Sequence, residues 1–221
     1  MTVTLGIIHT SVATLDVFPG LIRAEAPELR IINILDDSIL PELRDNGGRL
    51  EAVLPRWAGY CRTAKDQGAR LLLNACSSIG ALGATVSSQV GIPILRVDAG
   101  MARAAVRRGR RIAVIATLPT TLEPTTALVE ETARAEGVEA DVEAVLVEGA
   151  YDALMAGDRD GHDRRLVDAL GEVAARSDVV VLAQASMARV VPALAEEERG
   201  KVLASPPFAV ADVVAALARI S

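Results

Sequence analysis

Short apolar runs of strand length alternate along this chain of 221 residues with segments of helical periodicity. Clear apolar runs cover residues 30–35, 111–116 and 178–183. Such alternation is typical of βαβ units, in which consecutive strands lie parallel in one sheet. Helices cover both faces of a parallel sheet, so its strands are continuously apolar rather than alternating. The chain is therefore expected to be an α/β protein.

The same pattern gives approximate bounds for the elements. The expected strands cover residues 5–8, 30–35, 70–75, 92–95, 111–116, 142–147 and 178–183, and the expected helical segments cover residues 50–64, 101–106, 121–136, 166–174 and 208–220. Pro55 falls inside the first of these helical segments and is expected to kink it, because proline removes a backbone hydrogen bond.

Two pairs of segments repeat at a nearly constant spacing. Thr14-Leu15-Asp16 matches Thr121-Leu122-Glu123, and Cys76 matches Gln184 in almost the same register. Segments that repeat at a fixed spacing indicate that a structural unit is repeated in the fold. They predict two pseudo-symmetric, flavodoxin-like, three-layer αβα halves, with the carboxyl ends of both parallel sheets around an interdomain cleft. The first half would comprise residues 1–96 and 205–221, and the second residues 97–204.

The strand before Cys76 ends in the polar sequence Asn74-Ala75-Cys76-Ser77-Ser78. A thiol between a strand end and the start of a helix is expected to have a depressed pKa, because backbone N–H groups favour the thiolate. His9 follows the first strand, and a Cys–His pair would activate the thiol. The alternative for His9 is a loop residue that serves a backbone hydrogen bond, and for Cys76 a small core residue.

The other cysteine and histidine are expected to have no chemical role. Cys61 lies in the apolar stripe of the helix over residues 50–64, which indicates an inert core thiol. His162 lies among charged residues at a helix start and is expected to face solvent.

Hydroxyl and amide side chains gather after the related strand ends. Hydroxyls and free N–H groups at helix starts can bind a carboxylate, although capping is the ordinary role of each Ser or Thr. The candidate substrate-binding residues are Thr10, Ser11, Asn74, Ser77, Ser78, Thr117, Thr120, Thr121 and Ser186.

Composition excludes several kinds of partner. The net charge of −6 and an aromatic content of 2% argue against nucleic acid, which needs basic or stacking surfaces. No apolar run is long enough to span a membrane. The two cysteines lack metal-binding or disulfide spacing, and the N-terminal residues lack the pattern of a signal peptide. We therefore expect a cytoplasmic protein. The helix-rich exterior expected of this fold favours a homo-oligomer of two or more chains.

Three motifs in order resemble those of the aspartate/glutamate/hydantoin racemase superfamily: Asn74–Ser78, Ala116–Thr120 and Leu182–Met187. This resemblance implies a cofactor-independent isomerase that acts on a small carboxylate or amide substrate. In that family one thiol from each half exchanges a proton on opposite faces of a carbon atom. Here Gln184 stands in place of the second cysteine, and an amide can hydrogen bond but cannot act as an acid or base at neutral pH.

Three functions remain open on this basis. The chain could be a racemase or isomerase that uses Cys76 and another proton carrier, with His9 and Gln184 as further catalytic residues. It could be a single-cysteine lyase, such as a malonate decarboxylase. It could also be an inactive protein that binds small carboxylates.

Overall fold

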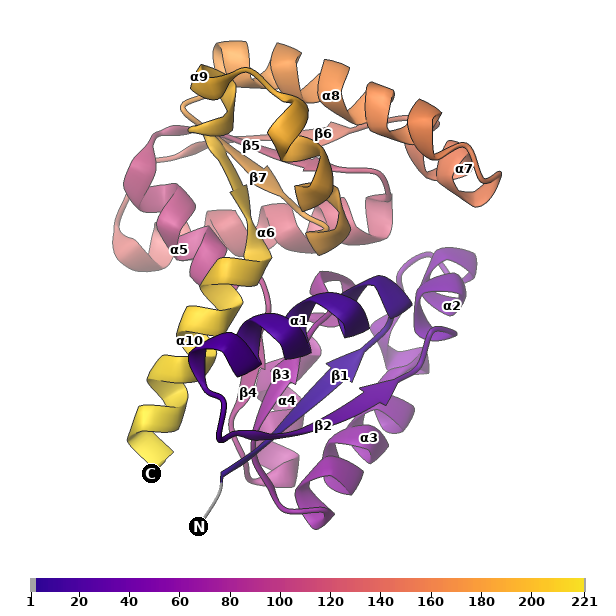
Figure 1. Cartoon of the computed structure of the whole chain (residues 1–221), viewed down its shortest axis with the longest axis vertical. Helices are drawn as coiled ribbons and strands as arrows, with labels where there is room; N and C mark the ends of the chain where they lie inside the picture. Colours follow the sequence, from indigo (N-terminus) through magenta and orange to yellow (C-terminus); the bar gives the residue numbers. More distant parts are fainter. Residues whose placement is uncertain (1–2, 221) are drawn as a thin grey trace. The chain divides into compact units, whose positions relative to one another are not determined.

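The expected alternation of strands and helices is present in a computed structural model, which describes residues 3–220 (Figure 1). Contacts within the chain divide it into two compact units. One unit comprises Met1–Gly100 with Pro206–Ser221, and the other comprises Met101–Ser205.

The first unit contains a parallel sheet of four strands in the order β2-β1-β3-β4. Its strands are β1 (Thr4–His9), β2 (Arg30–Leu35), β3 (Ala69–Asn74) and β4 (Ile94–Arg96). Its helices are α1 (Val12–Glu25), α2 (Ile39–Asp45), η1 (Leu50–Ala52), α3 (Leu54–Asp66), η2 (Ser77–Ile79), α4 (Leu82–Val90) and α10 (Ser205–Ile220), with α5 (Ala99–Arg108) beginning at its boundary. Helices α1 and α3 lie on opposite faces of this sheet (Figure 1).

The second unit contains a parallel sheet with the equivalent order, β6-β5-β7-β8. Its strands are β5 (Arg111–Ala116), β6 (Asp141–Leu146), β7 (Val179–Leu182) and β8 (Val202–Ala204). Its other helices are α6 (Pro119–Glu136), α7 (Ala150–Met155), α8 (Arg159–Arg176), η3 (Ala185–Ala193) and α9 (Glu196–Arg199). Helices α6 and α8 cover opposite faces of the sheet (Figure 1).

The central strands of each sheet are its most deeply buried ones. Every residue of β1 and of β7 is buried, whereas every residue of the edge strands β2 and β6 is exposed or only partly buried. One side of the first sheet packs on α3, where Trp57 and Cys61 are fully buried. The predicted α/β fold with two similar halves and parallel sheets is therefore confirmed.

The two halves also agree in register. Ile8 aligns with Asn74 in the first sheet, and Ile115 aligns with Leu182 in the second. The next backbone N–H donates to the equivalent carbonyl at 3.0 Å in both units, from Ala75 and from Ala183. Cys76 and Gln184 thus occupy equivalent places, just beyond the end of a central strand.

Two local expectations need correction. Pro55 does not kink a helix: α3 begins at Leu54, so the proline lies in its first turn, where its missing N–H has no intrahelical partner to lose. The sequence pattern also left out α1, which contains Pro19, and the short strand β8. Pro19 weakens the helical pattern of α1, and β8, with three residues, is too short to give a periodic signal.

Candidate active site

Cys76 lies in a buried turn at the carboxyl end of β3. Its backbone is extended (φ −137°, ψ 116°), and the single turn η2 follows at once. The side chain is in contact with the apolar cluster around α3, and the residue is only 6% exposed. The expected strand-end position is therefore correct, but the thiol is far more enclosed than a residue at an open loop.

Asn74 holds this turn from within. Its Oδ1 accepts a hydrogen bond from the Cys76 backbone N–H (3.2 Å), and its Nδ2 donates to the Ile79 carbonyl (3.3 Å). Asn74 is fully buried, so bulk water cannot replace these contacts. The structure thus gives this predicted substrate-binding residue a structural task, in which its side chain fixes both ends of the segment that carries the thiol.

Burial raises the pKa of the Cys76 thiol, which corrects the expected depression. Hydrogen bonds from the Thr10 hydroxyl, from the N–H groups of Ile79 and Ser78, and from the Ser78 side chain act in the opposite direction. Loss of hydration outweighs them because the charged thiolate is the form that burial disfavours. The thiol therefore carries its proton at neutral pH, which suits a proton donor better than a nucleophile.

His9 is fully buried at the end of β1, but its ring is engaged elsewhere. Its Nδ1 lies 2.9 Å from Thr14 Oγ1, and its Nε2 lies 3.1 Å from Asn33 Oδ1. The expected Cys–His pair is therefore not formed in this structure. Burial also lowers the pKa of His9, so the neutral imidazole is favoured. Sequence reasoning missed both contacts: Thr14 lies in the first turn of α1, and Asn33 of β2 becomes a neighbour of β1 only through the sheet.

The predicted hydroxyl residues of the first unit cluster around the ends of β1 and β3. Thr10, Ser77 and Ser78 are buried, and Ser11 caps α1 by accepting a hydrogen bond from the Ala13 N–H (3.3 Å). Capping, the ordinary role of a serine, thus applies to Ser11. The other three hydroxyl groups lie within or beside the thiol segment.

In the second unit, Gln184 takes the place of the thiol. Its Oε1 accepts hydrogen bonds from the Thr117 backbone N–H (2.8 Å) and from the Thr117 hydroxyl (2.9 Å). A backbone N–H can only donate, so the atom that faces it must be the amide oxygen. The Gln184 NH₂ group is consequently the free end, with no hydrogen-bond partner among residues 3–220.

The same threonine contact occurs in both units. Thr10 follows β1 and hydrogen bonds to Cys76, whereas Thr117 follows β5 and hydrogen bonds to Gln184. The two threonines are separated in the sequence by nearly the same spacing as their partners, in keeping with the repeat. The supporting threonine is thus the same in both units, whereas the supported group is a thiol in one and an amide in the other.

The other predicted residues of the second unit differ in exposure. Thr117 and Thr121 are buried at the carboxyl end of β5 and in the first turn of α6. Thr120 is partly buried, and Ser186 is exposed on η3. Thr117 therefore contacts another candidate residue directly, whereas Ser186 does so through no hydrogen bond among the described residues.

Cys61 and His162 are the other cysteine and the other histidine of the chain, and both are buried. Cys61 is fully buried, which confirms the expected place in the core, and burial raises its pKa to about 12. His162 is not solvent-facing as expected: it is 4% exposed, and its Nδ1 lies 2.8 Å from Asp163 Oδ1. Arg189 of η3 contacts the same carboxylate, so this cluster ties η3 to α8.

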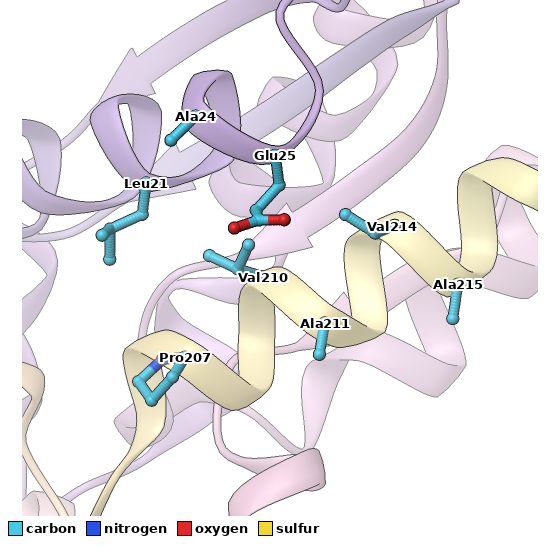
Figure 2. Close-up of a pocket in the computed structure, with 8 residues that line it drawn as sticks. All are labelled: Leu21, Ala24, Glu25, Pro207, Val210, Ala211, Val214 and Ala215. Carbon is cyan, nitrogen blue, oxygen red and sulfur yellow. The ribbon is translucent and has the colours of Figure 1, made fainter.

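No candidate residue lines the cavity that the first unit holds between α1 and α10. This cavity has a volume of about 610 Å³, and the Glu25 carboxylate points into the space between the two helices (Figure 2). Its lining is otherwise apolar and comprises Leu21, Ala24, Pro207, Val210, Ala211, Val214 and Ala215. Within residues 3–220, no three His, Cys, Asp or Glu side chains gather as metal ligands would. The same residues form no helix that is both long and apolar enough to cross a bilayer.

Comparisons with known proteins agree with this geometry. The chain is similar in structure to glutamate racemase isoform RacE1 from Bacillus anthracis, with a TM-score of 0.78 and 17% identity over 99% of this chain and 83% of the racemase. Allantoin racemase from Klebsiella pneumoniae gives a TM-score of 0.65 and 20% identity over 98% and 88% of the two chains. Arylmalonate decarboxylase gives 0.55 and 19% over 96% and 91%.

These structural likenesses establish the fold. A search of curated proteins found no match. The model of the Asp/Glu/hydantoin racemase family, however, matches residues 5–220, nearly the whole chain, and confirms the predicted family. The chain therefore belongs to the Asp/Glu/hydantoin racemase family.

Proposed function

We propose that this protein is an enzyme that transfers a proton, without a cofactor, at the carbon atom next to a carboxylate of a small substrate. Cys76 is its proton-carrying thiol. Family membership supports this proposal, as do the names of similar structures, which include glutamate and allantoin racemases and arylmalonate decarboxylase. All of these names refer to chemistry at a carbon atom beside a carbonyl or carboxyl group.

One observation favours a particular reaction: equivalent strand ends carry a thiol, whose pKa burial raises, and an amide. A racemase of two bases needs a proton carrier on each side of the carbon atom. Gln184 cannot accept or release a proton at neutral pH. A reaction that needs one proton donor is therefore best supported, and decarboxylation of a malonate-type substrate is such a reaction.

The proposed reaction needs only one thiol. Loss of CO₂ breaks a carbon–carbon bond and leaves the electron pair on the carbon atom as an enediolate. Cys76 then gives its proton to this carbon atom, and the resulting thiolate recovers a proton from water. The raised pKa of Cys76 favours the acid form that this step requires.

The remaining candidate residues would bind the substrate. Hydroxyls of Thr10, Ser77 and Ser78, which lie beside Cys76 in the first unit, would donate hydrogen bonds to the developing enediolate. Gln184, whose NH₂ group has no partner among the described residues of its own unit, is a candidate donor to a carboxylate oxygen. Donors aimed at developing negative charge can contribute several kcal/mol in a water-poor site. We assign His9 to holding the start of α1 and the end of β2, because its ring nitrogens contact Thr14 and Asn33.

A racemase that takes its second proton from water is the other candidate, favoured by the family model itself. The two candidates differ in products. Purified protein should be incubated in D₂O with substituted malonates, with amino acids and with hydantoins, beside the Cys76→Ala variant and a Cys61→Ala control. We expect malonate turnover that Cys76→Ala abolishes and Cys61→Ala keeps. Deuterium uptake into amino acids without malonate turnover would favour the racemase, and no reaction with any substrate would indicate a binding protein.

A further inference from the structure

Gly80, at the end of the turn that carries Cys76, lies directly against the Arg96 side chain. A Cβ atom on Gly80 would lie only 2.5 Å from Arg96 Cζ and 2.8 Å from Cδ. The backbone of Gly80 is ordinary helical (φ −54°, ψ −39°), which any residue adopts. Glycine is therefore needed here for the approach of Arg96 and not for its conformation.

Arg96 is not free to move aside. Its Nε donates to Asp98 Oδ1 at 2.7 Å and its NH₂ group donates to Oδ2 at 3.2 Å, which is a bidentate pair. The Asp98 side chain is fully buried and that of Arg96 is 16% exposed. Because such planar pairs fix geometry as well as charge, the guanidinium is held at one place against Gly80.

Arg96 also belongs to the frame around the thiol segment. It aligns with Asn74 across β3 and β4, and the Asn74 carbonyl accepts from the Val97 N–H at 3.1 Å. Asn74 fixes the turn from within through Cys76 and Ile79, and Arg96 bounds it at Gly80.

The second unit provides a comparison within the same chain. In the register that matches Cys76 with Gln184, Asn74 corresponds to Leu182 and Arg96 corresponds to Ala204. Leu182 and Ala204 align with each other across β7 and β8, as Asn74 and Arg96 do across β3 and β4. Gly80 corresponds to Ala188. The half without a thiol thus has a Cβ where the other half has glycine, and alanine where the other half has Arg96.

We propose that Arg96 is a positioning residue that, paired with Asp98, holds Gly80 and thereby keeps the Cys76 turn closed over its thiol. The inference rests on the proposed role of Cys76 in proton transfer. Its direct consequence is enclosure of the thiol, which can be measured without any substrate.

Alkylation of Cys76 by iodoacetamide across pH 6–10, read from the Cys76 peptide by mass spectrometry, tests the enclosure. In Arg96→Ala the turn should loosen, and the Cys76 rate at pH 8 should rise about tenfold, equivalent to a fall of about one unit in apparent pKa. The alkylation rate of Cys76 in Arg96→Lys should lie between that of the parent and that of Arg96→Ala. An Arg96→Ala profile equal to that of the parent would overturn the proposal, whatever the catalytic activity.

Gly80→Ala tests whether the contact itself is responsible. The added methyl group should raise the alkylation rate in the parent but change it little once Arg96→Ala has removed its neighbour. Equal effects in both backgrounds would show that Arg96 does not act through Gly80 and would contradict the proposal.

A paired variant guards against loss of folding, because Arg96→Ala leaves a buried carboxylate without its partner. Arg96→Met combined with Asp98→Asn removes both charges and keeps the volume, and it should show the same faster alkylation. Arg56→Ala is the matched control: this arginine of the same unit pairs with Asp36 and Glu42, supplies none of the atoms nearest to Gly80, and should leave the Cys76 profile unchanged. A similar change in Arg56→Ala would count against a specific role of Arg96.

Discussion

Replacing Asn74 by alanine would remove the internal support of the thiol turn. The change leaves two backbone groups, the Cys76 N–H and the Ile79 carbonyl, without the partners that now lie at 3.2 and 3.3 Å. A buried polar group without a partner costs about 1–3 kcal/mol. The free energy of unfolding of the first unit should therefore fall by about 2–6 kcal/mol, a large share of the roughly 5–15 kcal/mol typical of a domain.

Asn46→Ala provides a matched control. Asn46 also makes two side-chain hydrogen bonds to backbone groups, the N–H (2.8 Å) and the carbonyl (3.2 Å) of Arg49, but in an exposed turn. Water can replace those contacts, so the loss should stay below about 1 kcal/mol.

Urea titration monitored by tryptophan fluorescence measures both variants. The chain has a single tryptophan, Trp57, which is fully buried in the first unit and reports on the unfolding of that unit. We expect the midpoint of Asn74→Ala to fall well below that of Asn46→Ala. Equal midpoints would refute the view that Asn74 supports the turn through buried hydrogen bonds.

Three further predictions concern titration and chemistry. Thr10→Val removes a hydrogen bond that lowers the pKa of Cys76, so the alkylation profile of Cys76 should move to higher pH; an unmoved profile would count against the contact. Gln184→Cys places a second proton carrier at the equivalent strand end and should introduce racemisation, detected by chiral chromatography; a parent that already racemises as fast would contradict the assigned role of Gln184. The pKa of His9 is lowered in the folded protein, so the unfolded chain binds its proton more readily and the urea midpoint of the first unit should fall as the pH drops below about 6.5, less so in His9→Gln; no difference in slope between the two proteins would contradict this.

The fold could be predicted because its signals are local and repeated. Continuous apolar runs such as residues 112–116 indicate buried parallel strands, and two segment pairs that recur at nearly the same spacing indicate two related halves. Short or proline-containing elements were missed because they give a weak periodic signal. Pro55 shows the limit well: its effect depends on where the helix begins, which the pattern locates only within a few residues.

The positions of the candidate site residues could be predicted from the sequence, but their pKa values and hydrogen bonds could not. The equivalent positions of Cys76 and Gln184 could be predicted because each residue follows an apolar strand and the two segments repeat at nearly the same spacing. The pKa of Cys76, however, depends on how fully the turn is buried, and a motif does not report burial. His9 was paired with the wrong neighbour because sequence shows which strand it ends but not which way its ring nitrogens turn. Arg96 carried no motif and gains its meaning only from Gly80, which is not its neighbour in the sequence but lies against it in the fold.

The handedness of the product tests the central claim most directly. A prochiral substituted malonate that the parent protein decarboxylates should be converted in D₂O, and the product analysed by chiral chromatography and mass spectrometry. A single thiol delivers its deuteron to one face, so we expect one enantiomer with one deuterium at the new C–D bond, and loss of this reaction in Cys76→Ala. A racemic product, or the same product from Cys76→Ala, would contradict proton donation by Cys76.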